Sequence, residues 1–322
     1  MPIGIVAIGR NEGERLKSSL TAAVAVRDAI VFYVDSGSTD GSVEWARSLG
    51  ANVVELDMTK PFTAARARNE GFIALLDKHP DIKFVQFIDG DCELQPGWIE
   101  KAVNEFSVKP KAAVICGRRR ERFPEASRYN RLCDIEWNTP IGRAKACGGD
   151  AMFRAIAFEG VGGFNPDIIA GEEPELCVRL RQADWEIWRV DAEMTLHDAA
   201  MTRFSQWWKR NVRAGHAFAE GFDRHGAPPE EHWKREYQSN QKWGPLWLIP
   251  LAWPLFGVLA LKITRDRLRR RRGPLGESSL YGTFTALGKL PQWLGQRKYW
   301  RNKRAGRREK IIEYKGPATE AA

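Results

Sequence analysis

The stretch VQFIDGDCEL, residues 85–94, is apolar up to Ile88 and then places Asp89 and Asp91 on either side of one glycine. A short apolar run that ends at an Asp-Gly turn is typical of a buried strand. Two carboxylates this close repel each other unless a cation lies between them. The stretch therefore predicts a buried strand whose carboxyl end holds a divalent cation. A plain turn, which Asp and Gly also favour, is the alternative.

Short apolar runs and helical patterns alternate on both sides of this stretch. The sequence predicts strands over residues 3–8, 29–35, 52–56, 84–88 and 113–116. Helical patterns fill the intervals over residues 12–26, 42–49, 63–77 and 98–106. Apolar strands separated by amphipathic helices are typical of a parallel sheet that is covered on both faces. We therefore expect a doubly wound α/β domain.

Polar side chains also follow the first two predicted strands. Asn11 and Glu12 come after the first strand, and Asp35 and Ser38 come after the second. In an open α/β sheet, ligands bind beyond the carboxyl ends of the strands. We expect these four residues to meet the two aspartates of the Asp-Gly-Asp stretch at one site.

The composition is that of a folded protein with an uneven distribution of charge. The chain has 322 residues, of which 43% are hydrophobic, and a formal net charge of +9. Residues 262–322 carry 17 Lys and Arg against 5 Asp and Glu, so the preceding part is slightly acidic. This asymmetry argues against nucleic acid as the main partner and favours contact between the basic end and anionic lipid. The five cysteines include no Cys-x-x-Cys pair, which indicates free thiols in a reducing compartment.

Six stretches carry a resemblance to a known family. They are VAIGRNE (6–12), VDSGSTDGS (34–42), AARARNEGF (64–72), DGD (89–91), CGGDAMFR (147–154) and GEEPELCVRLRQADWEI (171–187). In this order they resemble glycosyltransferase family 2, whose members have the GT-A fold and use nucleotide sugars. The resemblance covers roughly residues 3–215. It implies a Rossmann-like, mostly parallel sheet and transfer of a sugar with inversion.

The resemblance implies roles for the residues that bind donor and metal. Asp35 would hydrogen-bond the nucleotide base, and Arg68 with Asn69 would line the nucleotide pocket. Asp89 would face the ribose or the donor sugar. Asp91, supported by Asp89, would bind the Mg²⁺ or Mn²⁺ ion that holds the diphosphate.

Three further residues are assigned to the same donor and metal site. His197 would be an additional metal ligand, although a core or surface histidine is almost as good an interpretation. Arg210 and Arg213 share a helix face with Trp207 and would neutralise the diphosphate leaving group.

An acidic pair and a glycine pair complete the predicted site. In this family an acidic pair supplies the general base, usually as Glu then Asp; here the pair is Glu172 and Glu173, and Glu173 stands in the Asp position. The alternative is that acidic residues simply favour a helix N-terminus. Gly148, Gly149 and Asp150 would form the floor under the acceptor, with a glycine turn between strands as the alternative. The Arg-rich residues 117–140 would either bind an acidic acceptor or form a solvated helix.

The composition changes after residue 220. We predict a glycosyltransferase domain over residues 1–220, a linker over 221–243 and a hydrophobic, basic helical tail over 244–322. Residues 244–261 carry no charge but contain two prolines in their interior. A single span would put the following Arg cluster on the far side from the nucleotide sugar, so we expect a monotopic arrangement. Packing of the tail helices on each other, or a dimer interface, is the alternative.

The sequence thus predicts a metal-dependent, inverting glycosyltransferase at the cytoplasmic face of the inner membrane. It would transfer a sugar to a hydroxyl of a glycan or lipid-linked acceptor, as in bacterial cell-surface polysaccharide or glycolipid synthesis. A nucleotidyltransferase is one alternative, but residues 7–16, AIGRNEGERL, lack its glycine- and arginine-rich phosphate loop. A non-catalytic GT-A-like membrane scaffold is the other, and the intact Asp89, Asp91 and Glu173 argue against it.

Overall fold

The computed structural model describes residues 2–270 and 272–307. These residues form two compact units. The first contains the described residues up to 122 together with 137–199, and the second contains 123–136 and the described residues from 200 onward. The division falls before residue 220 because the long helix α8 (Phe204–His225) packs against α12 (Lys289–Arg304) in the second unit.

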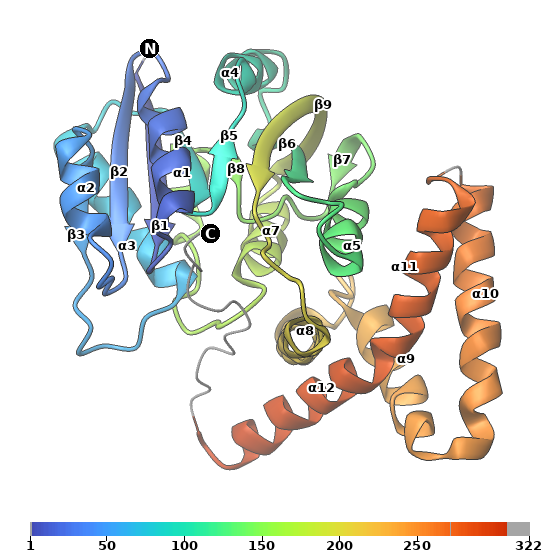
Figure 1. Cartoon of the computed structure of the whole chain (residues 1–322). Helices are drawn as coiled ribbons and strands as arrows, with labels where there is room; N and C mark the ends of the chain where they lie inside the picture. Colours follow the sequence, from blue (N-terminus) through green and yellow to red (C-terminus); the bar gives the residue numbers. More distant parts are fainter. Residues whose placement is uncertain (1, 271, 308–322) are drawn as a thin grey trace. The chain divides into compact units, whose positions relative to one another are not determined.

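One sheet forms the centre of the first unit (Figure 1). Its strands are β1 Ile3–Gly9, β2 Ala29–Asp35, β3 Asn52–Glu55, β4 Phe84–Asp89, β5 Cys92–Leu94, β6 Ala112–Glu121, β7 Gly142–Ala144, β8 Ala151–Arg154 and β9 Glu186–His197. The strand order is β3-β2-β1-β4-β8-β6-β9-β5, and β7 pairs with β9. The predicted α/β fold class, with a mostly parallel sheet, is confirmed.

The direction of the strands decides where the site lies. Strands β3, β2, β1 and β4 are parallel to one another. Strand β8 is antiparallel to both β4 and β6, so β6 runs in the same direction as β4, and β9 is parallel to β6. The carboxyl ends of these six codirectional strands therefore meet at one edge, which we call the carboxyl edge.

Helices cover the sheet as the helical patterns predict. The first unit contains α1 Glu14–Val24, α2 Ser42–Ser48, α3 Ala64–Lys78, α4 Trp98–Val108, α6 Ala155–Gly160 and α7 Glu172–Gln182. Helix α3 begins after Thr63, whose hydroxyl accepts the backbone N–H of Arg66 (3.0 Å). It packs closely on the sheet through Gly71, where a Cβ would lie 2.5 Å from Val6 Cγ1.

The second unit is helical. It contains most of α5 (Arg128–Trp137), and then α8, α9 Lys234–Trp243, α10 Trp253–Arg269, α11 Leu275–Leu287 and α12. The predicted linker 221–243 is thus largely helical. The uncharged stretch 244–261 is not one helix, because its prolines divide it into the 3₁₀ turns η1 (Pro245–Leu248) and η2 (Pro250–Ala252) and the start of α10. Among the described residues, no helix has the length and apolar character needed to cross a membrane.

Candidate active site

The loops that follow β1 and β2 are bonded to each other at the carboxyl edge. The backbone N–H of Asn11 donates to Ser38 Oγ (2.9 Å), and the N–H of Thr39 donates to Asn11 Oδ1 (2.7 Å). Glu12, which follows Asn11, pairs with Arg15 at 2.9 Å. The two loops therefore form one continuous surface at this edge.

Asp35, the last residue of β2, is buried and holds the loop that follows it. Its Oδ2 accepts the backbone N–H groups of Gly37 and Ser38, both at 2.8 Å. Its Oδ1 accepts the hydroxyl of Tyr33 (2.8 Å), and burial together with this carboxylate raises the pKa of Tyr33. The carboxylate thus shapes the start of the predicted nucleotide pocket.

Asp89 ends β4 between two arginines. Arg68 Nη2 lies 2.6 Å from Asp89 Oδ1, while Arg119 Nη2 lies 3.8 Å from Asp89 Oδ2. Each guanidinium also binds a second carboxylate: Arg68 Nη1 donates to Glu172 Oε1 (2.9 Å), and the same Arg119 Nη2 lies 2.8 Å from Asp150 Oδ2. Burial lowers the pKa of both arginines, but the carboxylates more than offset it and raise the pKa above the usual value.

Asp150 links the loop before β8 to the strand end. Its Oδ1 accepts the backbone N–H of Asp89 (3.2 Å), and its Oδ2 accepts the hydroxyl of Thr195 (2.9 Å). Asp150 is fully buried, so its two bonds fix the position of Asp89 relative to β9.

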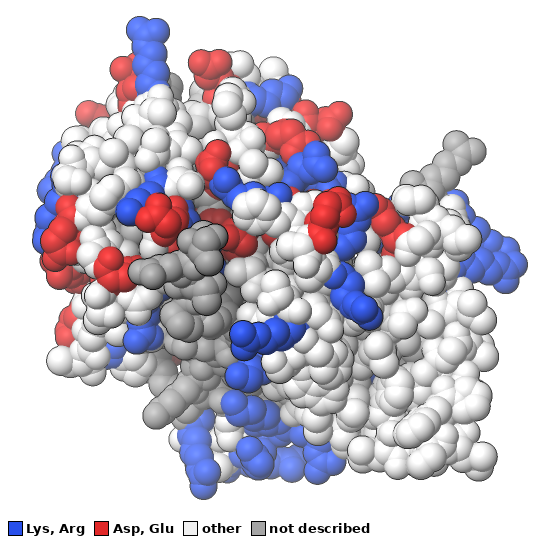
Figure 2. All heavy atoms as spheres, in the orientation of Figure 1, with Lys and Arg blue, Asp and Glu red and all other residues white. Residues whose placement is uncertain are grey.

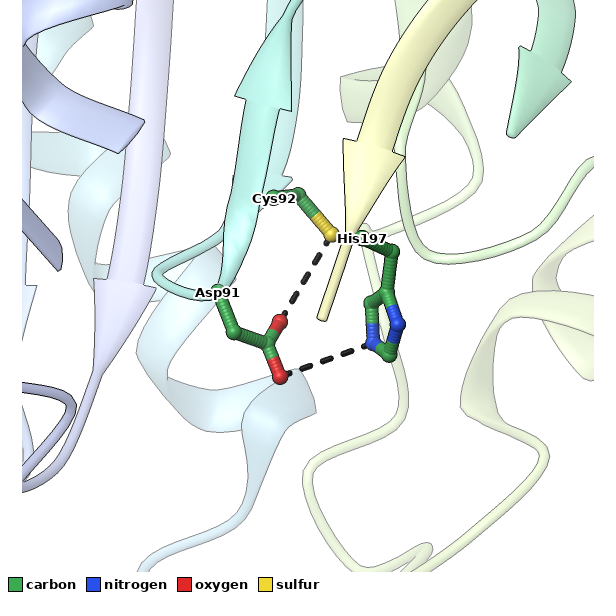
Figure 3. Close-up of side chains that lie close together, drawn as sticks. All are labelled: Asp91, Cys92 and His197. Atoms are coloured by element: carbon green, nitrogen blue, oxygen red, sulfur yellow. Dashed lines mark hydrogen bonds and ion pairs between the residues drawn. The ribbon is translucent and has the colours of Figure 1, made fainter. Parts of the chain in front are cut away.

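The side chain of Asp91 points toward His197 (Figure 3). His197 Nε2 lies 3.5 Å from Asp91 Oδ2, and both residues are 5% exposed. On the other side of the ring, Glu121 Oε2 lies 3.8 Å from His197 Nδ1 and accepts the backbone N–H of Ala199 (3.0 Å). The two carboxylates of the Asp-Gly-Asp stretch therefore have separate partners, which relieves the repulsion between them.

Asp91 and His197 fit a divalent cation. A carboxylate oxygen and an imidazole nitrogen are both donors that Mn²⁺ accepts. In an octahedron with ligands about 2.1 Å from the metal, neighbouring ligand atoms lie about 3.0 Å apart. Asp91 Oδ2 and His197 Nε2, at 3.5 Å, would have to approach by only about half an ångström. Glu121 beyond the ring is in the place where metal-binding histidines take a carboxylate partner. The Cys92 thiol, 3.6 Å from Asp91 Oδ1, is a poorer ligand for a hard ion, and burial raises its pKa well above the usual value.

The acidic pair opens helix α7, which fits the alternative of a helix N-terminus and leaves the base role a prediction. Gly171 precedes the helix with φ 85°, a conformation that favours glycine, and Glu172 points to Arg68. Glu173 is buried, and its Oε1 accepts the backbone N–H of Cys147 at 2.6 Å. The same oxygen lies 3.0 Å from the sulfur of Cys147 and 3.1 Å from that of Cys177. Burial raises the pKa of Cys177 to about 11 and that of Cys147 well above its usual value.

The predicted acceptor floor lies against the arginine and aspartate pair. A Cβ on Gly149 would lie 2.8 Å from Arg68 Nη2 and 3.3 Å from Asp89 Oδ2. Gly148 has φ 95°. The loop therefore approaches the guanidinium as closely as only a residue without a side chain allows.

Three predicted donor residues have other surroundings. The side-chain amide of Asn69 donates to the backbone carbonyl of Phe164 (2.7 Å) and accepts its N–H (2.9 Å), so it fastens a loop. Arg210 and Arg213 lie on α8 in the second unit, where Arg210 pairs with Glu136 at 2.7 Å. Their role in binding the diphosphate stays a prediction.

Sequence reasoning missed several residues of the site. In the sequence, Arg119 and Glu121 stand within an Arg-rich stretch, and no local pattern singles out Thr195, Cys147 or Cys177. Residues 119 and 121 end a ten-residue strand and lie two positions apart, so they face the same side of it. That alternation was the available signal for the first two, whereas the cysteines meet only through the fold.

The comparisons with known proteins agree with this geometry. Residues 5–154 match the family model described as Glycosyl transferase family 2. The succinoglycan biosynthesis protein ExoA of Rhizobium meliloti is 25% identical over 231 residues, which cover 67% of this chain and 66% of that protein. The glycosyltransferase AglE of Haloferax volcanii is 24% identical over 217 residues, covering 64% and 69% of the two chains. A pre-mycofactocin glycosyltransferase of Mycobacterium tuberculosis is 25% identical, and the chain spans about half of its length (48%).

Two solved structures have a similar fold. The mannosyltransferase PcManGT from Pyrobaculum calidifontis, in complex with GDP-Man and Mn²⁺, has a TM-score of 0.56 and 18% identity, covering 94% of this chain and 86% of that one. Glucosyl-3-phosphoglycerate synthase from Mycobacterium tuberculosis, in complex with Mn²⁺ and UDP, has a TM-score of 0.51 and 18% identity, covering 70% and 81%. With its sheet and its carboxyl-edge aspartates, the chain has the GT-A fold, and its residues 5–154 are similar to glycosyltransferase family 2.

Proposed function

We propose that this protein transfers one sugar from a nucleotide-diphosphate sugar to a hydroxyl of a glycan or lipid-linked acceptor, with inversion at the anomeric carbon. The observation that carries the proposal is that the two aspartates at the end of β4 have different neighbours. Asp89 lies between Arg68 and Arg119, while Asp91 lies beside His197. Two solved structures of similar fold contain Mn²⁺ with GDP-Man or with UDP, which supports a nucleotide-sugar donor and a divalent metal.

The chain's own residues would hold the donor at the carboxyl edge. Asp35, already bonded to the loop after β2, would hydrogen-bond the nucleotide base. Asp91 and His197 would hold a Mg²⁺ or Mn²⁺ ion, which, when bound, neutralises charge on the departing diphosphate. Arg68, which is buried, and Arg119, which is partly buried, would keep Asp89 in a fixed position against the donor sugar, because each also pairs with another carboxylate.

Glu173 would act as the general base for the acceptor hydroxyl. The bonds that the structure gives for Glu173 within the described residues go to Oε1, which leaves Oε2 to accept the hydroxyl proton. Glu172 is engaged by Arg68 and would act as a positioning residue. One displacement without a covalent intermediate gives inversion, so the anomeric configuration of the product, read by nuclear magnetic resonance, tests this step.

Nucleotide binding tests the donor site. Melting temperatures are measured with UDP or GDP, each with and without Mn²⁺, for the wild type, for Asp91→Ala and for the matched control Asp77→Ala. Asp77 is exposed on α3, outside the carboxyl edge. We expect one nucleotide to stabilise the wild type and the control only when Mn²⁺ is present, by about 2.7 kcal/mol at a ligand concentration of 100 times Kd. Equal stabilisation of Asp91→Ala, or none in a folded wild type, contradicts the proposed site.

We also propose that the second unit binds an anionic membrane surface. Apolar side chains are exposed from η1 to α10, with Leu251 92%, Leu248 65% and Val258 63% exposed. Figure 2 shows an uncharged surface over this part of α10 and Lys and Arg side chains gathered toward the end of α12. Exposed apolar residues beside basic residues are typical of helices that lie in a bilayer interface. Attachment to the cytoplasmic face of the inner membrane would bring a lipid-linked acceptor and a cytosolic donor to one protein.

Vesicle flotation tests the membrane proposal. We expect the wild type to float with phosphatidylglycerol vesicles and to stay behind with neutral phosphatidylcholine. Leu251→Ser with Val258→Ser should lose binding, whereas Val108→Ser, an exposed apolar position in the first unit (69% exposed), should keep it. The proposal is overturned if the double variant floats as the wild type does. It is also overturned if the wild type forms a dimer through this surface and does not bind vesicles.

A further inference from the structure

Two cysteines and the proposed base form a cluster inside the first unit. Cys147 lies in the loop before β8, and Glu173 and Cys177 lie one turn apart on α7. The sulfur atoms of Cys147 and Cys177 are 3.8 Å apart, and Glu173 Oε1 lies 3.0 Å and 3.1 Å from them. Positions i and i+4 share one face of a helix, so α7 directs two ligand atoms at the same point. We call these three residues the thiol cluster.

We propose that the thiol cluster is a second metal site, one that takes Zn²⁺ in preference to the Mg²⁺ or Mn²⁺ expected at Asp91. In a tetrahedral site with Zn–S bonds of about 2.3 Å, two sulfur ligands lie about 3.8 Å apart. The two sulfur atoms of the cluster already have this separation. A sulfur and a carboxylate oxygen would be about 3.5 Å apart, so Glu173 must move by only about half an ångström.

The donor set decides which ion the cluster takes. Two thiolates and one carboxylate form a soft set that suits Zn²⁺, whereas Mg²⁺ and Mn²⁺ favour oxygen donors. Both thiols must lose their protons on binding, so each bound ion releases two protons to the solvent and replaces the S–H···O bonds to Glu173 with metal bonds. Three protein ligands leave the fourth position for water, a common arrangement for zinc.

A zinc ion here would occupy the carboxylate that the proposed reaction uses as its base. This consequence rests on the proposed function, whereas binding to the cluster does not. Zinc bound at Oε1 would draw negative charge from the carboxylate and make Oε2 a weaker base, so the protein would lose turnover while Mn²⁺ remains at the donor site. The fold would thus carry an inhibitory site for one metal close to an activating site for another.

Titration of the reduced protein with Co²⁺, a spectroscopic substitute for zinc, tests the site directly. We expect a thiolate-to-cobalt charge-transfer band in the near ultraviolet that one equivalent of Zn²⁺ removes. Cys147→Ser and Cys177→Ser should each weaken binding by more than 100-fold or so, since even changes behind a ligand cost 10–100-fold. Cys133→Ser, a buried cysteine of the second unit, is the matched control and should keep the band. Melting curves establish that each variant is folded.

The second possible source of such a band is Cys92, which lies beside Asp91 and His197. The band should persist in Asp91→Ala if it arises at the thiol cluster. Loss of the band in Asp91→Ala, its survival in both Cys147→Ser and Cys177→Ser, or its absence from the wild type would overturn the proposal.

Turnover measurements separate the site from its consequence. With saturating Mn²⁺, Zn²⁺ should inhibit the wild type and Cys133→Ser but leave the rate of Cys147→Ser unchanged relative to the same variant without zinc. Cobalt binding at the cluster without any inhibition by zinc would support the metal site and overturn the assignment of Glu173 as the base.

Discussion

Replacing Arg68 with methionine should destabilise the first unit strongly, because the change leaves two carboxylates without their shared cation. Arg68 is 2% exposed and pairs with Asp89 at 2.6 Å and with Glu172 at 2.9 Å. Removing one partner of a buried ion pair costs about 3–5 kcal/mol. Since the side chain of Asp89 is 29% exposed, solvent screens part of the loss, and we expect about 2–3 kcal/mol.

Thermal unfolding measures this cost. For a unit of this size, 1 kcal/mol shifts the melting temperature by roughly 2–4 °C, so Arg68→Met should melt about 4–12 °C below the wild type. The matched control is Arg47→Met, which removes a pair with Glu55 whose side chains are 54% and 57% exposed. The control should lose less than about 1 kcal/mol.

A second substitution tells whether the loss of stability comes from the unpaired carboxylates or from the lost packing of the Arg68 side chain. Adding Asp89→Asn to Arg68→Met removes one of the two unpaired carboxylates, so the double variant should melt above the single variant. Sugar transfer should stay undetectable in both. The electrostatic reasoning would be refuted if Arg68→Met were no less stable than Arg47→Met. It would also be refuted if the loss of stability in the double variant equalled the loss in Arg68→Met plus the loss in Asp89→Asn alone.

Three further predictions concern close contacts and one buried lysine. Gly149→Ala places a Cβ 2.8 Å from the guanidinium it faces and should lower transfer at least tenfold, whereas Gly160→Ala, with open space around it, should keep the wild-type rate. In the second unit, the Cβ of Gly295→Ala would overlap a backbone carbonyl of α8, so this variant should have a lower melting temperature. Gly257→Ala, in open space on α10, should have a slightly higher melting temperature. Equal melting temperatures for the two variants would argue against a close approach of α12 to α8. Burial lowers the pKa of Lys289 from 10.5 to about 8. Between pH 8 and pH 10.5 the lysine therefore holds its proton in the unfolded chain but not in the folded protein, so the free energy of unfolding rises with pH over this range. At pH 7, Lys289→Met should therefore be more stable than the wild type by on the order of 1–3 kcal/mol in urea unfolding. This difference should shrink between pH 8 and 10.5, and a difference that stays constant with pH would contradict the lowered pKa of Lys289.

Much of the first unit could be predicted from the sequence because its strands are buried on both faces. The runs before Asp35 and Asp89 are apolar apart from Gln86, and the structure ends β2 and β4 at these two residues. Local pattern was therefore enough to place both carboxylates at the ends of strands.

The partners of those carboxylates could not be predicted in the same way. Arg119 reaches Asp89 only because β8 lies between β4 and β6, an order that local patterns do not show. Cys147 and Glu173 are 26 residues apart and meet through that same arrangement. The prolines of the uncharged stretch after residue 243, by contrast, are visible in the sequence, and they divide that stretch in the structure.

The reversed direction of β8 has a consequence for how the specificity of this protein can change. Residues proposed for the donor follow strands that end at the carboxyl edge, whereas Gly148, Gly149 and Asp150 precede a strand that begins there. Under the proposed function, the two substrates would thus be recognised by segments with independent lengths and independent sequences. Exchanging the segment before Gly148 should alter which hydroxyl is glycosylated while the choice of nucleotide sugar is inherited unchanged.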